Sequence, residues 1–233
     1  MPAETKLLIT IDGPAGAGKT TASRRLAARL GYRHIDTGAL YRAVAYAARA
    51  RGIDPEDDAA LGRLLAALTI GFAPAPAEGP ARVTADGEDV TEAIRTPEIA
   101  QLASAISARP VVRAGLLGLQ RDLGRGKGAV FEGRDMGTVV FPEADLKFFL
   151  TASEEARARR RYAEMGGGRS GLRFEDVLDE LRRRDRRDAE RAVAPLRAAA
   201  DAILIDSSDL TLEQVVEAML GRVQARLAPP RDG

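Results

Sequence analysis

The sequence predicts an α/β fold with a parallel sheet, and three observations support this. A glycine loop, residues 13–20, fits the pattern G-x-x-x-x-G-K-[ST] and stands between an apolar run and an amphipathic stretch. Short apolar runs alternate with helical patterns along the chain, which is typical of a parallel sheet covered by helices. Residues 69–89 break this alternation with two strand-like pieces and the tight-turn pair Asp86-Gly87, which indicates a small antiparallel insertion.

The individual elements follow from the same patterns. Buried strands are expected at residues 7–11, 129–131, 146–150 and 202–205, with a weaker candidate at 33–35. Helices are expected at residues 20–30, 39–50, 57–68, 97–107, 111–123, 153–165, 174–189 and 212–227. The insertion is expected to contain strands at 69–73 and 81–85, and its Pro/Ala run is expected to form a stiff surface turn.

Composition limits the possible functions. At 233 residues the chain is long enough for one domain with a substantial core. A net charge of +1 gives no general attraction to nucleic acid or to a membrane, so neither is expected as a partner. The absence of cysteine excludes disulfides and thiolate chemistry. Because the first apolar run is too short for a signal or spanning segment, we expect a soluble cytoplasmic protein.

The glycine loop is expected to bind the phosphates of a nucleoside triphosphate. Glycines let the backbone approach an anion closely, and the start of the following helix directs amides at it. Lys19 would reach the outer phosphates, and the Thr20 hydroxyl would bind Mg²⁺. The residues expected to hold the nucleotide are Gly13, Pro14, Ala15, Gly16, Ala17, Gly18, Lys19, Thr20 and Thr21.

Two further groups of polar residues follow expected strands. In the run of residues 36–42, Thr37 and Arg42 could bind a second anion at a helix N-terminus, although an ordinary N-cap with a solvated Arg42 remains open. In the run of residues 132–138, Arg134 could clamp an acceptor phosphate and Asp135 could accept from an exocyclic amine. Glu132 could hold a Mg²⁺-bound water. The alternative is a surface turn in which Arg134 pairs with Asp135.

The remaining charged clusters lie on expected helices. Arg184, Asp188 and Arg191 have the spacing of one helix face and would suit a ribose and a polar base edge, but a solvated helix is equally open. A second arginine run, residues 157–161, precedes a glycine tract at 165–171 that could be a lid hinge or only a flexible loop. His34 has no catalytic partner in the sequence and is expected to be structural.

Five segments carry a resemblance to a known family: ITIDGPAGAGKTTASRRLA, DTGALYRA, GEDVTEAIRTPEIAQLAS, GRDMGTVVFPEADLKFFL and RRDRRDAERAVAPLRAAADAILIDSS. The chain resembles the bacterial cytidylate kinase (CMP kinase) family of nucleoside monophosphate kinases over nearly its whole length. The resemblance implies a single P-loop domain with a five-stranded parallel core at residues 1–36, 109–152 and 200–228. It also implies an acceptor-binding region with the β insertion at 37–108 and a short lid at 153–175.

The same resemblance implies transfer of a phosphoryl group from ATP to CMP or dCMP, with Mg²⁺, by a monomer. It implies that Thr37, Arg42 and Arg134 hold the acceptor phosphate. Ser104, Arg113, Asp135 and Arg191 would read the cytosine, and Arg184 and Asp188 would contact the sugar. Lys19, Arg134 and the lid arginines Arg157 and Arg161 are the expected catalytic residues.

Three other functions remain open on the sequence. The chain could be a kinase for adenylate, uridylate or shikimate, because the P-loop does not identify the acceptor. It could be a nucleotide-dependent switch or an RNA-associated ATPase, which the near-neutral charge disfavours. It could be a structural protein whose glycine loop binds nothing.

Overall fold

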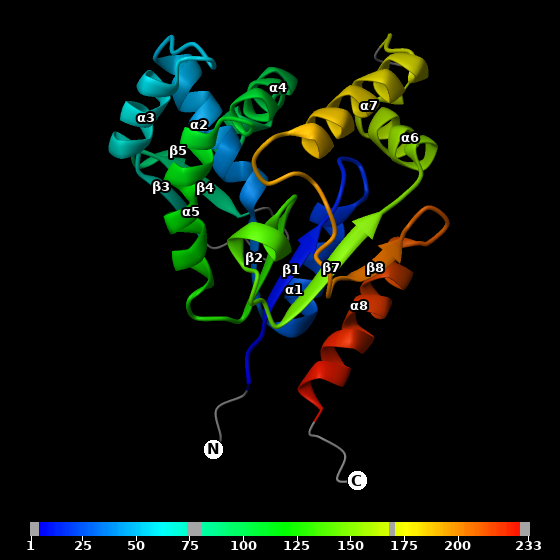
Figure 1. The fold of residues 1–233 in the computed structure, drawn as a ribbon. Helices are drawn as coiled ribbons and strands as arrows, with labels where there is room; N and C mark the ends of the chain where they lie inside the picture. Colours follow the sequence, from blue (N-terminus) through cyan, green and yellow to red (C-terminus); the bar gives the residue numbers. More distant parts are fainter. Residues whose placement is uncertain (1–4, 74–80, 168–170, 229–233) are drawn as a thin grey trace. The chain divides into compact units, whose positions relative to one another are not determined.

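The computed structural model describes residues 5–73, 81–167 and 171–228, which divide into two compact units (Figure 1). The first unit comprises Met1–His34 and Gly126–Gly233, and the second comprises Ile35–Arg125. The expected Pro/Ala turn at 74–80 and part of the expected lid hinge at 168–170 lie outside the described residues. The expected division into core, acceptor-binding region and lid stays a prediction.

A five-stranded parallel sheet forms the centre of the first unit, as predicted. Its order is β2-β6-β1-β7-β8, and β2 runs across the boundary between the units. The central strand β1 pairs in parallel with β6 and β7, which places Thr10 opposite Phe131 and Lys147. Every residue of β1 and β6 is buried, because both faces of these strands are covered. The strands are Leu8–Asp12 (β1), Arg33–Asp36 (β2), Ala129–Gly133 (β6), Leu146–Thr151 (β7) and Ile203–Asp206 (β8).

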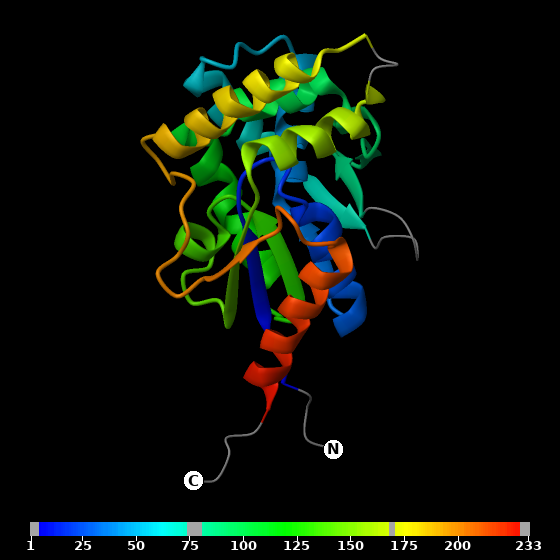
Figure 2. The ribbon, with the colours of Figure 1, turned by 90° about the vertical axis from the view of Figure 1, so that its right-hand side faces the viewer.

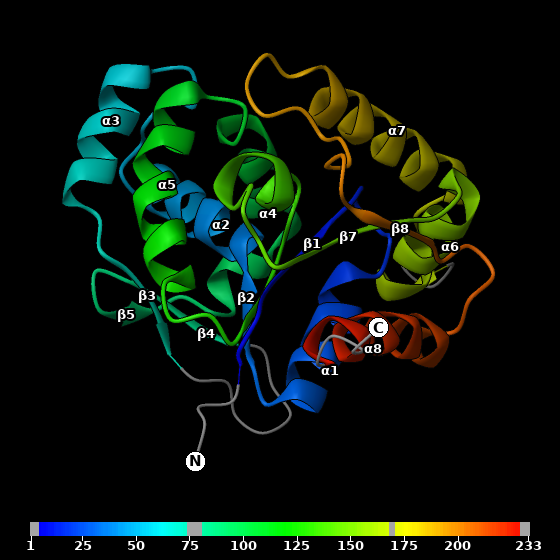
Figure 3. The same cartoon turned by 60° about the horizontal axis from the view of Figure 1, so that its bottom comes forward.

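Two helices cover one face of this sheet. α1, Lys19–Leu30, and α8, Leu212–Leu227, lie side by side in Figures 2 and 3. A capping box fixes the start of α8, in which Thr211 and Gln214 satisfy each other's backbone amides. The apolar core between sheet and helices includes Ile9, Ile11, Leu26, Val130, Phe148 and Met219.

A second pair of helices, α6 (Glu154–Glu164) and α7 (Phe174–Glu190), packs side by side in the first unit (Figure 2). Ala158 of α6 and Leu181 of α7 are buried against Ala15 of the glycine loop. The helix pair is therefore in direct contact with the loop, and its packing positions the loop's backbone.

The end of α7 corrects one prediction. The helix stops at Glu190, and Arg191 is extended, with φ −60° and ψ 136°. Arg191 therefore does not continue the helical face of Arg184 and Asp188. Pro195 is incompatible with continuation of the helix, since a proline has no amide to donate and its ring would clash with the carbonyl four residues earlier, that of Arg191. The Leu196 amide instead turns back to the Asp188 carbonyl, at 2.8 Å.

The second unit is mainly helical and contains the predicted insertion. Its antiparallel sheet has the order β3-β4-β5, and the two-residue strand β5 was not predicted. Figure 3 shows α3 and α5 side by side, and the core includes Leu40, Val44, Leu61 and Ile106. The elements are Thr37–Ala50 (α2), Asp58–Ala67 (α3), Ile70–Ala73 (β3), Arg82–Ala85 (β4), Glu88–Asp89 (β5), Ala93–Arg95 (η1), Pro97–Ile106 (α4) and Pro110–Gly124 (α5).

The described residues include no single helix with the length and apolar composition to cross a membrane. Within residues 5–73, 81–167 and 171–228, one bent pair, α4 and α5 with 100° between them, meets that test when the two helices are taken together.

Candidate active site

The glycine loop joins β1 to α1, as the motif predicts. Gly13 has φ 148°, and a Cβ there would lie 1.9 Å from the Leu150 carbonyl oxygen, so only glycine lets the loop pass this close to β7. Gly18 is left-handed, with φ 86°, and immediately precedes α1. The loop therefore leads directly into a helix N-terminus, where unpaired amides and the helix dipole favour an anion.

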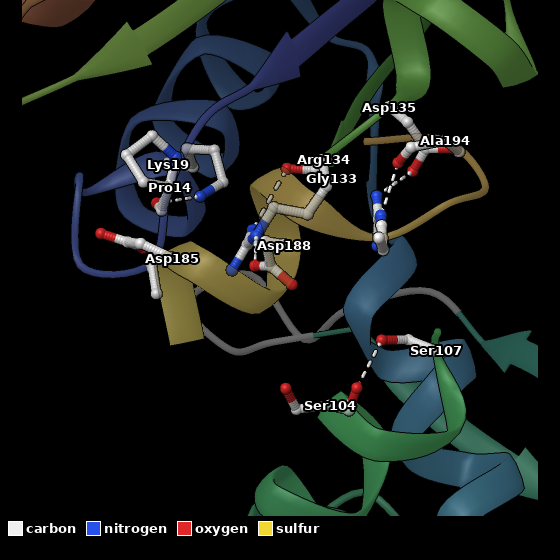
Figure 4. Close-up of polar contacts among 12 residues, drawn as sticks. Pro14, Lys19, Ser104, Ser107, Gly133, Arg134, Asp135, Asp185, Asp188 and Ala194 are labelled. Atoms are coloured by element: carbon white, nitrogen blue, oxygen red, sulfur yellow. Dashed lines mark hydrogen bonds and ion pairs between the residues drawn. The ribbon is translucent and has the colours of Figure 1, made fainter. Parts of the chain in front are cut away.

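Lys19, the first residue of α1, is held inside the loop. Its side chain is buried, and Nζ donates to the Pro14 carbonyl at 2.7 Å (Figure 4). Burial lowers the pKa of Lys19 well below its ordinary value, and the positive charges of Arg134 and Arg184 lower it further. The opposing charges of Glu132 and Asp12 compensate only in part. A bound anion beside Lys19 would favour the charged form of its ammonium group.

Thr20, the next residue of α1, contacts the end of β6. Its hydroxyl donates to Oε2 of Glu132 at 2.9 Å, and Glu132 is buried. Oε1 of Glu132 lies 3.1 Å from Nε2 of His34. Two oxygen groups of the kind that Mg²⁺ prefers therefore lie together beside the loop.

Asp12 ties the end of β1 to the turn after β6. Its carboxylate accepts from the Met136 amide at 2.8 Å and from the Gly137 amide at 2.7 Å. These amides open η2, the π-helical turn Met136–Val140. Burial raises the pKa of Asp12 to about 6, against the lowering effect of the two amides. Asp12 therefore positions the segment that carries Arg134 relative to the glycine loop.

Arg134 is paired with Asp188 of α7. Nε of Arg134 lies 3.0 Å from Oδ2 of Asp188, and Nη1 donates to the Gly133 carbonyl (Figure 4). Burial opposes ionisation of Asp188, yet Arg134 and Arg184, with a smaller effect of Arg191, hold its pKa below the ordinary value. Arg134 thus pairs with α7 and not, as the alternative interpretation required, with the adjacent Asp135.

Asp135 and Arg191 form a second, deeply buried pair. Nη2 of Arg191 lies 3.4 Å from Oδ1 of Asp135, and both side chains are at most 5% exposed. Nε of Arg191 donates to the Ala194 carbonyl. Arg191 therefore reaches Asp135 from the loop after α7, although it is not on the helix.

The arginines of α6 differ in their contacts. Arg157 is buried, and its Nη1 donates to the Ala15 carbonyl of the glycine loop at 3.1 Å and contacts Asp185 of α7. Nη1 of Arg160 lies 3.5 Å from the Ala17 carbonyl. Arg161 is exposed and pairs with Glu164 at 3.4 Å. The catalytic roles expected for Arg157 and Arg161 stay predictions.

The remaining acceptor-binding candidates belong to the second unit. Asp36 caps α2 by accepting from the Ala39 amide at 3.2 Å, and it pairs with Arg42 at 2.7 Å. Thr37 is buried at the start of α2. The N-cap interpretation is therefore correct for Asp36. Its second part, a solvated Arg42, is not, because the Arg42 side chain is only partly exposed and pairs with Asp36.

Ser104 and Arg113 are linked through Ser107. Nη1 of Arg113 donates to the Ser107 carbonyl at 3.2 Å. The Ser107 hydroxyl in turn donates to the Ser104 carbonyl at 3.0 Å (Figure 4). The guanidinium of Arg113 lies over the Tyr41 ring, 5.7 Å from its centre. Among the described residues, the buried Ser104 hydroxyl has no hydrogen-bond partner, which suits a group that binds a ligand.

Four residues with a part in this site were not singled out as functional from the sequence: Asp12, His34, Arg160 and Asp185. Asp12 was detectable, since it ends the strand directly before the glycine loop. His34, Arg160 and Asp185 each contact a residue that is distant in the sequence. The strand order and the packing of helices bring these partners together. A linear sequence contains no comparable signal for those contacts.

A parallel five-stranded sheet, a glycine loop between β1 and α1, and a buried lysine at the start of α1 define a P-loop protein of the kinase type. The fold agrees with that of a shikimate kinase from Bacteroides thetaiotaomicron, at TM-score 0.50 and 12% identity, over 94% of this chain and 99% of that one. The family model described as "Cytidylate kinase" matches residues 9–225.

Relatives of known family agree with this match. A cytidylate kinase from Geobacter sulfurreducens is 53% identical over 220 residues, covering 94% of each chain. One from Citrifermentans bemidjiense is 50% identical over 226 residues, covering 97% of this chain and 96% of the relative. The chain belongs to the cytidylate kinase family, and it is a nucleoside monophosphate kinase.

Proposed function

We propose that the protein transfers the γ-phosphoryl group of ATP to the phosphate of CMP or dCMP, with Mg²⁺. The observation that carries the proposal is the glycine loop, which leads into the N-terminus of α1 and holds the buried Lys19 with its Nζ 2.7 Å from the Pro14 carbonyl oxygen. Phosphoryl transfer spreads negative charge over the equatorial oxygens of the migrating group, so buried and fixed cations stabilise its transition state. Family membership supports a nucleoside monophosphate as the acceptor.

On the donor side, the loop's amides and Lys19 are assigned to the ATP phosphates. In the structure, Nζ of Lys19 donates to the Pro14 carbonyl. A phosphate oxygen is a stronger acceptor for an ammonium group than a neutral carbonyl is, because the hydrogen bond is charge-assisted on both sides. ATP binding would therefore draw Lys19 from the loop's carbonyl to the nucleotide.

The residues beside the loop fit a bound Mg²⁺. Thr20 and Glu132 would hold the ion, directly or through water, and the ion would neutralise charge on the phosphates. The Thr20 proton is already directed at Glu132, so the hydroxyl oxygen keeps lone pairs for a cation. Glu132 thereby prepares Thr20 for the role that the motif predicts.

On the acceptor side, each unit contributes its own candidates. In the first unit, Arg134 is assigned to the acceptor phosphate, and Arg184 and Asp188 to the sugar. Asp135 and Arg191 are assigned to cytosine. In the second unit, Thr37 and Arg42 are assigned to the phosphate, and Ser104 and Arg113 to the base. These assignments come from the family resemblance, and the two ion pairs of the first unit, Arg134–Asp188 and Arg191–Asp135, support them.

Selectivity for cytosine follows from the chemistry of these side chains. Cytosine presents an N4 amine, which the Asp135 carboxylate can accept from, and an O2 acceptor that Arg191 can donate to. Uracil presents a carbonyl in place of the amine, which would leave buried polar groups unpaired at a cost of about 1–3 kcal/mol each. The protein should therefore favour CMP over UMP.

A coupled assay of ADP release across four acceptors tests the proposal. CMP and dCMP should support rapid turnover, whereas UMP and AMP should give kcat/KM values lower by about 10-fold or more for each unpaired group. Equal turnover of UMP and CMP would contradict the assigned selectivity. ATP hydrolysis that no nucleoside monophosphate stimulates would contradict the kinase reaction itself.

A further inference from the structure

His34 is the only histidine of the chain, and it lies between two polar groups beside the glycine loop. Its Nε2 is 2.9 Å from the Ser23 hydroxyl of α1 and 3.1 Å from Oε1 of Glu132 at the end of β6. The imidazole is 13% exposed, and the Glu132 side chain is 4% exposed. His34 therefore makes its contacts largely out of water.

The available protons fix the direction of these contacts. The Ser23 hydroxyl has one proton, which it donates to the Thr20 carbonyl at 3.2 Å. Glu132 accepts the Thr20 hydroxyl proton on Oε2 and faces His34 with Oε1. Because both neighbours of Nε2 then act as acceptors, the imidazole proton belongs on Nε2 and is shared between them.

The contact restrains Glu132 at both oxygens. The glutamate side chain has three rotatable bonds, so a single hydrogen bond from Thr20 would leave the Glu132 carboxylate free to rotate. The second bond, from His34, fixes the plane of the carboxylate, and with it the direction of the Thr20 proton. Groups that orient a metal-binding side chain in this way typically change metal affinity 10- to 100-fold when they are removed.

We propose that His34 is a positioning residue for metal-bound nucleotide, acting through Glu132 on the Thr20 hydroxyl. The inference rests on the proposed function, because it requires that Thr20 and Glu132 hold the Mg²⁺ of Mg·ATP. His34 is not expected to contact the nucleotide or the metal. It is expected to raise the affinity for ATP in the presence of Mg²⁺ and to leave the affinity for metal-free ATP unchanged.

The test measures nucleotide binding with and without the metal. ATP affinity is determined by calorimetry in EDTA and in excess Mg²⁺, and the Mn²⁺·ATP complex is followed by electron paramagnetic resonance. His34→Leu removes the donor, whereas His34→Gln keeps an N–H close to the position of Nε2. Tyr32→Phe is the matched control, since it removes the acceptor of the Leu7 amide in the chain just before His34.

His34→Leu should weaken binding of the metal–ATP complex by about 10-fold and leave binding in EDTA unchanged. His34→Gln should restore most of the loss, and Tyr32→Phe should leave the ratio of the two affinities as in the wild type. In a Glu132→Gln background, His34→Leu should have no further effect, because the contact acts through Glu132.

The inference would be overturned if the ratio of the two affinities in His34→Leu were the same as in the wild type. Either both affinities would then be unchanged, or both would fall equally, in which case His34 would be only structural. Failure of the proposed function is distinguishable from both, because the wild-type protein would then bind ATP no better with Mg²⁺ than without it.

Discussion

Arg134 and Asp188 form a partly buried ion pair, with Nε of the arginine 3.0 Å from Oδ2 of the aspartate. The pair ties the turn after β6 to α7, elements that are 54 residues apart in the chain. Because the aspartate holds the guanidinium in place, Arg134 is fixed before any acceptor binds. Fixed cations cost no reorganisation when negative charge develops.

Replacing Asp188 by alanine should raise the KM for CMP and dCMP by about 10-fold or more, because a charge-assisted contact is lost and Arg134 is released. The KM for ATP should change little. Glu190→Ala, an exposed change on the same helix, is the matched control. Steady-state kinetics with each acceptor decides the matter, and unchanged KM values for both would exclude a role for Asp188 in acceptor binding.

Replacing Lys19 by methionine should separate activity from stability. kcat should fall on the order of 10²-fold or more, since a cation that acts on the transition state is removed. The melting temperature should change little, because relief of the unfavourable burial of the Lys19 charge offsets loss of the hydrogen bond to the Pro14 carbonyl. Near-wild-type turnover of the purified variant would reject the catalytic role.

Asp12 should make the folded protein less stable as the pH rises from 4 to 6. Its pKa is about 6 in the folded protein, above its ordinary 3.8, so between these values the folded state binds a proton that the unfolded state releases. The free energy of unfolding contributed by Asp12 is therefore largest below pH 4 and decreases as the pH rises through 6. The difference corresponds to about 3 kcal/mol at 1.36 kcal/mol per pH unit.

Carboxylates with lowered pKa, such as Asp188, act in the opposite direction, so the wild type alone does not isolate Asp12. Asp12→Asn cannot titrate at this position. Denaturant unfolding of both proteins from pH 4 to 7 should show the wild type losing stability relative to the variant as the pH rises. A difference that stays constant across this range would refute the raised pKa.

Arg157 should be required for normal binding of ATP, the phosphoryl donor. Its Nε donates to the Ala152 carbonyl at 3.0 Å while Nη1 donates to Ala15 at 3.1 Å. A lysine has a single ammonium group and cannot bridge these sites as the planar guanidinium does. Arg157→Lys should therefore raise the KM for ATP by about 10-fold, at a cost of about 1–3 kcal/mol for each carbonyl left unpaired.

Arg159→Lys, an exposed change on the same helix, serves as the control for Arg157. It should leave the KM for ATP as in the wild type. If Arg157→Lys also bound ATP normally, the contact with Ala15 would have no part in shaping the loop.

Much of the fold was predictable because its signals are local. The glycine motif and the apolar runs placed the five strands of the parallel sheet to within two residues at each end, and the pair Asp86-Gly87 marked a turn of the insertion. The strand β5 was missed because two residues, Glu88 and Asp89, are too few for a periodic pattern.

The errors and omissions in the predicted site have a common cause, which is contact between residues that are far apart in the sequence. Helical spacing placed Arg191 on the face of Arg184, but Pro195 and the turn after Glu190 move it to Asp135 through the loop. The π-helical turn at Met136 was not predicted, because its first amides bind Asp12, 124 residues earlier in the chain. Local periodicity contains no information on such partners.

The central claim is that the γ-phosphoryl group of ATP is transferred to CMP. Incubation of the protein with Mg²⁺, CMP and ATP isotopically labelled in its γ-phosphate, followed by separation of the nucleotides, tests it most directly. The account predicts that the label appears in the β-phosphate of CDP. Label released only as inorganic phosphate, with no labelled CDP, would contradict it.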